Sequence, residues 1–148
     1  MTNFDGQAEA AAIFDRLKVL VGGRVYLDIP DDANLVKDPL GKIRPFIHLG
    51  FGDPIPATRG RSLGRENVQP YILPVSVTSA AASTTEAGSV AAGVRNLLIG
   101  WAPPLYNAGQ MKGGTGRSLT RVDAQGAPTR RERVSNYELL VNLAPALG

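Results

Sequence analysis

The chain has 148 residues, 43% of them apolar and 20% charged, so it is large enough for one globular domain with a buried core. It contains no cysteine, which excludes a disulfide framework, a thiol nucleophile and a zinc site built on cysteine. The net charge of +3 is uneven: residues 1–58 carry 6 basic and 8 acidic side chains, whereas residues 59–148 carry 10 and 5. This asymmetry is consistent with head-to-tail contact between copies or with a basic surface facing nucleic acid, and chance clustering on a solvated surface is the alternative.

No stretch of the chain is apolar for long enough to span a bilayer. The N-terminal residues do not combine a basic region with an apolar run, as a secretory signal does. We therefore expect a protein that stays, or assembles, where it is made.

The first predicted element is a helix at residues 5–21, where apolar side chains recur at helical spacing until Gly22 and Gly23 end it. A short strand at residues 24–29 follows, and a polar loop comes after Pro30. The loop lacks the alternating oxygens, central glycine and distal glutamate of a calcium site, so we expect no metal there.

The second predicted strand spans residues 46–51 and contains His48, the single histidine of the chain. No second metal ligand or nucleophile lies at a meaningful spacing from it. We therefore interpret His48 as a surface or interface residue and not as a catalyst.

Residues 52–67 form the most unusual segment, with two prolines, three glycines and three arginines but no apolar period. The arginines are Arg59, Arg61 and Arg65. Long loops without secondary structure are usually functional or disordered, so we interpret this one as a mobile basic arm. It would contact phosphate or become ordered on a protein partner.

A strand at residues 68–79 and a helix at residues 84–99 form the centre of the predicted domain. Apolar residues alternate along the strand, and its two prolines, Pro70 and Pro74, remove N–H donors from one side, which predicts a sheet edge or a bulge there. Ser83, followed three residues later by Glu86, predicts a capping box at the helix start.

The outer face of this second helix carries small and polar residues, unlike a typical solvated face. Small residues allow close approach of another element, so we identify candidate subunit contacts at Gly88, Ala92 and Asn96. The alternative is an exposed face with no partner.

We expect a second long loop at residues 102–116 and a closing hairpin of strands at 118–123 and 129–143, before a loose tail at 144–148. The loop ends in KGGTG, which lacks the spacing of a phosphate-binding P-loop. One end of the hairpin is basic and is a candidate partner surface, with a solvated hairpin tip as the alternative; its arginines are Arg117, Arg121, Arg130, Arg131 and Arg133.

Together these elements predict one α+β domain over residues 1–148. It would contain a mainly antiparallel sheet of four to five strands with two helices packed on one face, and the long Arg/Gly-rich loop between strands 2 and 3. The other face of the sheet would meet solvent or a neighbour.

Motifs of catalysis are missing from the sequence. We find no acid–base carboxylate pair, nucleophile elbow, zinc spacing or dinucleotide fingerprint. We therefore predict that the protein is not an enzyme and assign no catalytic, cofactor-binding or metal-binding residue.

The chain resembles the tail terminator, or tail-to-head joining, proteins of long non-contractile-tailed bacteriophages. The resemblance covers about residues 8–143. It lies in the order of the elements and in the general residue pattern within them. It rests on AAIFDRLKVLVGGRVYLD, RPFIHLGFGDP before the Arg/Gly-rich loop, VQPYILPVSVTSAAASTTEAGSVAAGVRNLLIGW and RVSNYELLVNL.

The resemblance implies a virion protein that is assembled in the host cytoplasm and forms a homo-oligomeric ring, commonly a hexamer. The ring would cap the head-proximal end of the tail tube, end its polymerisation and offer a joining surface to the head connector. DNA would pass through the ring without sequence-specific binding. Arg59, Arg61 and Arg65 would then dock partners or face the lumen.

Two other functions stay open, and an enzyme is a third only if a pocket is found around His48. The chain could be another ring protein of the phage neck, such as a head-completion protein, and binding to tail tubes but not to filled heads would decide between the two. It could also be a basic nucleic-acid-binding module, which predicts DNA retention that falls steeply with salt.

The basic arm generates a first prediction. Limited proteolysis of the purified monomer should cut first within residues 52–67, because an unpartnered loop without secondary structure is accessible to proteases. Mass spectrometry of the first fragments locates the cut, and a protease-resistant segment would contradict the interpretation.

Overall fold

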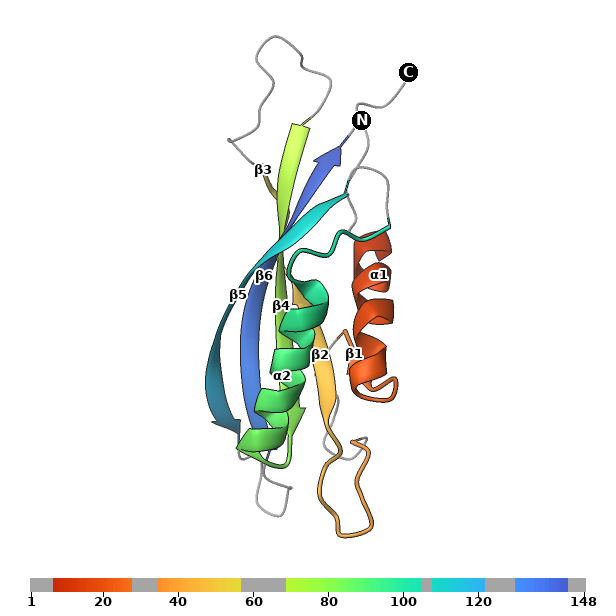
Figure 1. Cartoon of the computed structure of the whole chain (residues 1–148), viewed down its shortest axis with the longest axis vertical. Coiled ribbons are helices and arrows are strands. Elements are labelled where there is room, and N and C mark those ends of the chain that lie inside the picture. The colour runs from red at the N-terminus through yellow and green to blue at the C-terminus, as the bar shows by residue number, and fades with distance from the viewer. Residues whose placement is uncertain (1–6, 28–34, 57–68, 105–107, 122–129, 144–148) are drawn as a thin grey trace.

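The computed structural model describes residues 7–27, 35–56, 69–104, 108–121 and 130–143. This part of the chain has an α+β fold, with two helices on one face of a mixed six-stranded sheet (Figure 1). The helices are α1 (Gln7–Leu17), extended by a 3-10 turn at Lys18–Leu20, and α2 (Thr84–Leu98). The predicted fold class is confirmed, although the sheet has one strand more than the four or five expected.

The strands lie in the order β1-β2-β4-β6-β5, and β3 pairs with β4 outside this path. β1 runs parallel to β2, and the other four pairings are antiparallel. The bounds are Val25–Tyr26 (β1), Phe46–Phe51 (β2), Ile55–Pro56 (β3), Gln69–Ala81 (β4), Ala108–Arg121 (β5) and Arg130–Leu143 (β6).

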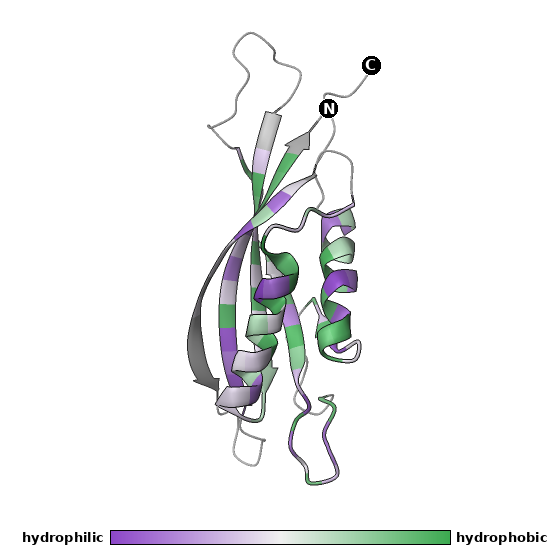
Figure 2. Ribbon diagram, in the orientation of Figure 1, coloured by the Kyte–Doolittle hydropathy of each residue, from purple (hydrophilic) through white to green (hydrophobic). Residues whose placement is uncertain are grey.

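The main core lies between the sheet and the helices. Successive strand residues point to opposite faces, so every second residue of β2, β4 and β6 meets the helices. Apolar and polar residues alternate along these strands in Figure 2. Buried members of this core include Ile47 and Leu49 from β2, Leu73, Val75 and Val77 from β4, Tyr137 and Leu139 from β6, Ile13 and Leu17 from α1, and Val94 and Leu98 from α2.

Helix α2 begins where its sequence predicts and ends one residue before the predicted end. The Ser83 hydroxyl oxygen accepts a hydrogen bond from the Glu86 amide at 3.2 Å, which satisfies one of the free donors at the helix start. Gly100 follows the helix with a φ of 77°, a conformation that favours glycine. The buried face consists of Ala87, Ala91, Val94 and Leu98.

Helix α1 lies beside α2 (Figure 1), and the 3-10 turn that follows α1 contacts α2 at Gly93. A Cβ at Gly93 would lie only 2.9 Å from Leu20 Cδ2. Arg16 donates from Nε to the Leu97 carbonyl at 3.1 Å and lies over the Trp101 ring. Gly93 therefore serves a contact within the chain.

A second, smaller core lies on the opposite face of the sheet. Leu35 and Ile43 are buried there against Phe46 and Ala80. Asp38 stabilises the turn between Leu35 and Ile43. Its Oδ1 accepts hydrogen bonds from the amides of Leu40 and Lys42 at 2.9 Å. The end of the predicted polar loop thus covers part of the face that we expected to be bare.

Strand β5 corrects the predicted loop at 102–116, because it begins at Ala108 and includes most of that segment. The glycines that suggested a loop instead allow close strand pairing. A Cβ at Gly113 would lie 2.8 Å from the Asn136 carbonyl oxygen, and one at Gly116 would lie 2.7 Å from that of Val134. Glycine can therefore mark close backbone approach within a sheet as well as a turn.

Of the two alternatives predicted at Pro70 and Pro74, the sheet edge was wrong, because β4 is an interior strand between β2 and β6. The bulge alternative fits Pro74, because residues 52–54 lie opposite only residues 73 and 74. Pro74 is tolerated because it lies where one partner strand ends and the next begins. β2 pairs with β4 only as far as Val75, and β3 pairs from Ile72.

Two other boundaries differ from the predicted ones. β1 is limited to two residues of the predicted strand at 24–29, and β3 lies inside the predicted loop at 52–67. Residues 57–68, with Arg59, Arg61 and Arg65, lie outside the described residues, as does the tail at 144–148.

The two glycines of α2 generate a matched prediction. Gly88→Ala should raise the free energy of unfolding by up to about 1 kcal/mol, since alanine favours a helix and a Cβ there meets nothing within 4 Å. Gly93→Ala should raise the free energy of unfolding by less than Gly88→Ala does, because the new methyl group displaces Leu20. Urea denaturation measures both, and a Leu20→Ala background should reduce the difference. If the two substitutions raised the free energy of unfolding equally in the wild-type background, this account of Gly93 would be contradicted.

Candidate functional site

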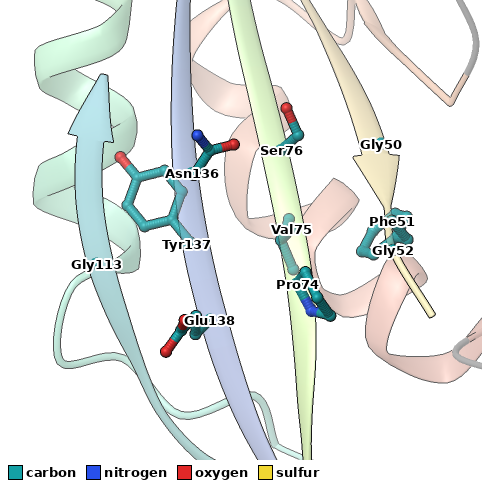
Figure 3. Close-up of a pocket in the computed structure, with 10 residues that line it drawn as sticks. All are labelled: Gly50, Phe51, Gly52, Pro74, Val75, Ser76, Gly113, Asn136, Tyr137 and Glu138. Atoms are coloured by element: carbon teal, nitrogen blue, oxygen red, sulfur yellow. The ribbon is translucent and has the colours of Figure 1, made fainter. Parts of the chain in front are cut away.

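A groove of about 610 Å³ lies on the sheet face opposite the helices and crosses β2, β4 and β6 (Figure 3). We call it the sheet-face groove. Its floor is formed by small or polar residues whose neighbours along each strand face the main core: Gly50, Gly52, Pro74, Ser76, Asn136 and Glu138.

The groove exists because its central residues are small. Gly50 is exposed, and a Cβ there would find Ser76 Cβ as its nearest neighbour at 3.8 Å. Asn136 and Glu138 on β6 are exposed as well. Another chain could therefore approach the backbone of these strands closely and meet polar side chains along one side.

β5 provides a second accessible feature, because β6 is its only neighbouring strand in the described part of the chain. Near Met111 the outer side of β5 is occupied by residues 99–101, which exchange two backbone hydrogen bonds with Met111. Further along, the register shifts between Gly113 and Thr115, and Gly113 and Gly114 have positive φ angles. Such irregularity opposes uncontrolled strand addition at a sheet edge.

The predicted arginine sites have different environments. Arg117 and Arg121 lie on β5 in register with Val134 and Arg130 of β6. Arg133 is exposed, Arg131 is half-buried and Arg130 is buried, with only 2% of its surface accessible. The structure therefore does not present the hairpin arginines as one exposed cluster.

Arg130 is held by a buried ion pair. Its Nε lies 2.9 Å from Glu132 Oε1, and both side chains are at most 5% exposed. The guanidinium carbon also lies 6.0 Å from the centre of the Phe46 ring, where a cation–π attraction operates. Arg130 thus contributes to the interior of the far face, beside the second core.

His48 lies on the same face of the sheet, half-buried and stacked on Phe46 with ring centres 6.5 Å apart. In the described residues no group of three or more His, Cys, Asp or Glu side chains is arranged to hold a metal ion. No helix in the described part of the chain is long and apolar enough to cross a membrane.

The predicted subunit contacts on α2 border a second concavity, of about 270 Å³, which we call the α2–β6 pocket. Gly88 and Ala92 line it, while Asn96 is exposed on the same helix outside its lining. The rest of the lining comes from two residues of α2 and from strands β5 and β6: Ala91, Arg95, Gly114, Gly116, Arg133, Ser135 and Tyr137.

Tyr137 is the most unusual side chain of this pocket, because it is 1% exposed and its hydroxyl makes no hydrogen bond within the described residues. Burial raises the pKa of Tyr137, while the nearby Ser135 hydroxyl and the Arg95 charge act in the opposite direction. The sequence does not indicate Tyr137 as a candidate site residue. Tyr137 continues the apolar alternation of its strand, and that pattern does not reveal the surroundings of the hydroxyl.

No protein-family model matches the chain, and no curated protein sequence matches it. Among solved structures, a chain from the "Virion of native gene transfer agent (GTA) particle" is similar, with a TM-score of 0.51 and 20% sequence identity. The similarity covers 90% of this chain and 93% of that chain. At this identity it shows a shared fold over nearly the whole of both chains.

The buried ion pair generates a prediction about Arg130. Arg130→Met should lower the free energy of unfolding by about 3–5 kcal/mol, because it removes the positive charge that lies 2.9 Å from the buried Glu132 carboxylate. The double variant Arg130→Met/Glu132→Leu should recover much of that loss, since it removes both charges of the pair together. Urea denaturation of both variants tests this. A loss below about 1 kcal/mol for the single variant would indicate a solvated pair.

Proposed function

We propose that this chain is a structural protein of a virion and that it caps the head-proximal end of a phage tail tube as a homo-oligomeric ring, a hexamer in the simplest case. The observation that carries the proposal is the fold shared along nearly the whole chain with a component of a gene transfer agent virion. The sequence resemblance to tail terminator proteins supports the more specific role.

The two concave surfaces support a ring. The sheet-face groove and the outer face of α2, with Gly88, Ala92 and Asn96, lie on opposite faces of the sheet. If the α2 face of one copy packs in the groove of the next, the contact joins two different surfaces. A heterologous contact of this kind forms a closed ring when a whole number of equal rotations from copy to copy adds up to 360°.

In this role the protein assembles in the host cytoplasm and remains in the virion. Its partners are its own copies, the tail tube protein and the head connector, and genomic DNA passes through the lumen. The basic arm with Arg59, Arg61 and Arg65 would dock a partner or line that lumen. The role requires binding surfaces and no catalysis.

The ring generates a prediction with two matched variants. Ser76→Arg fills the groove, and Ala92→Arg blocks the α2 face, so each should prevent ring formation by the purified protein. Each variant retains one intact surface, so an equimolar mixture should form heterodimers but no rings. Mass measurement in solution and electron microscopy distinguish these species, and Ala11→Arg on the exposed face of α1 should leave rings intact.

Rings that persist in both variants would overturn the proposed contact. The place in the virion is tested by binding of the wild-type protein to purified tail tubes and to filled heads. Binding to filled heads alone would indicate a head-completion protein instead. Salt-sensitive retention on DNA without any ring would indicate a nucleic-acid-binding module.

A further inference from the structure

The α2–β6 pocket has the lining that a negatively charged group requires. Its polar side chains are two arginines, Arg95 and Arg133, and two hydroxyl residues, Ser135 and Tyr137; the other lining residues are glycine or alanine. No acidic side chain is among the residues that line it. Every lining side chain that can form a hydrogen bond is therefore a possible donor, and two carry positive charge.

The Tyr137 hydroxyl is an independent indication of a ligand. The Ser135 side chain is near enough to affect the pKa of Tyr137, but the hydroxyl is fully buried and has no partner in hydrogen-bond geometry within the described residues. Buried polar groups without a partner are rare, because each carries a desolvation cost. The phenol ring extends from β6 toward β5 (Figure 3). A Cβ at Gly114 would lie 3.5 Å from its Cε1.

Arg95 is positioned at the same place. Its Nη1 donates a hydrogen bond to the Gly114 carbonyl at 3.2 Å, which holds the guanidinium over β5. A Cβ at Gly114 would lie 3.2 Å from that nitrogen, so glycine keeps this space open between α2 and β6. The guanidinium and the Tyr137 ring thus both border Gly114, at the floor of the pocket.

We propose that the α2–β6 pocket binds one oxyanion group, a carboxylate or a phosphate, between Arg95 and the hydroxyls of Tyr137 and Ser135. The anion accepts the hydrogen bond that Tyr137 lacks within the described residues, and the guanidinium balances its charge. A free anion or an acidic side chain of a second copy can supply this group. Glu138, exposed in the sheet-face groove, is a residue of the second kind.

The test uses the full chain, labelled with ¹⁵N and titrated separately with inorganic phosphate and with acetate. At least one of these anions should shift the amide signals of Gly114 and Gly116 saturably. Tyr137→Phe and Arg95→Gln should each weaken that binding about tenfold, because a hydrogen bond to a charged group contributes about 1.5–3 kcal/mol. Lys112→Gln removes an exposed positive charge from β5 outside the pocket and should leave the affinity within about twofold.

Tyr137→Phe should also fold as stably as the wild type in anion-free buffer, since the hydroxyl it removes makes no hydrogen bond within the described residues. Equal binding by wild type and Tyr137→Phe would overturn the proposal, as would the absence of saturable shifts with both anions.

The source of the group is decided by self-association. If a second copy supplies the carboxylate, then Glu138→Gln, or an excess of the bound anion, should weaken the association of copies at constant ionic strength. If the natural ligand is a free anion, association should be unchanged while the amide shifts remain. Either result supports the oxyanion site, which is tested on the dilute monomer and does not depend on the ring.

Discussion

β4 and β6 pair without interruption from Gln69 opposite Leu143 to Ala81 opposite Arg131, and the other elements are attached to this pair. Directly opposed residues on the helix side are apolar, as in Leu73 with Leu139 and Val75 with Tyr137. Such cross-strand pairs are the unit that stabilises a sheet. β2 and β3 add to the free side of β4, β5 adds to the free side of β6, and α2 covers the apolar face between them.

The same pair of strands separates the two candidate binding surfaces. Because side chains alternate between faces, neighbouring residues of β6 belong to different environments: Ser135 lines the α2–β6 pocket, Asn136 and Glu138 line the groove, and Tyr137 borders both. A small rotation of β6 would therefore alter both surfaces together. Because β6 contributes to both the sheet-face groove and the α2–β6 pocket, the geometry of one surface constrains the geometry of the other. Such coupling is useful if the two surfaces bind different neighbours.

The sequence correctly predicted the elements in which apolar side chains recur at a regular spacing. The alternation around Val75 and the Ser83 cap locate β4 and α2 correctly. β5 was missed because glycine has no side chain with which to alternate, and the closeness of β5 to β6 is a tertiary property. The α2–β6 pocket could not be foreseen, since Arg95 and Tyr137 meet only after folding. For Arg130, Glu132 two positions later was an available signal, because residues at that spacing share one face of a strand.

The glycines of β5 also constrain how this protein can change over time. At Gly113 and Gly116 even the smallest side chain would begin within 2.8 Å of a carbonyl oxygen on β6. A mutation there separates two backbones, and no compensating change in a single side chain restores their distance. We expect descendants of this chain to vary freely at exposed positions outside the proposed contacts, such as Ala11 of α1, while they retain glycine at these two positions. Selection on this strand would then act on backbone spacing and not on chemical identity.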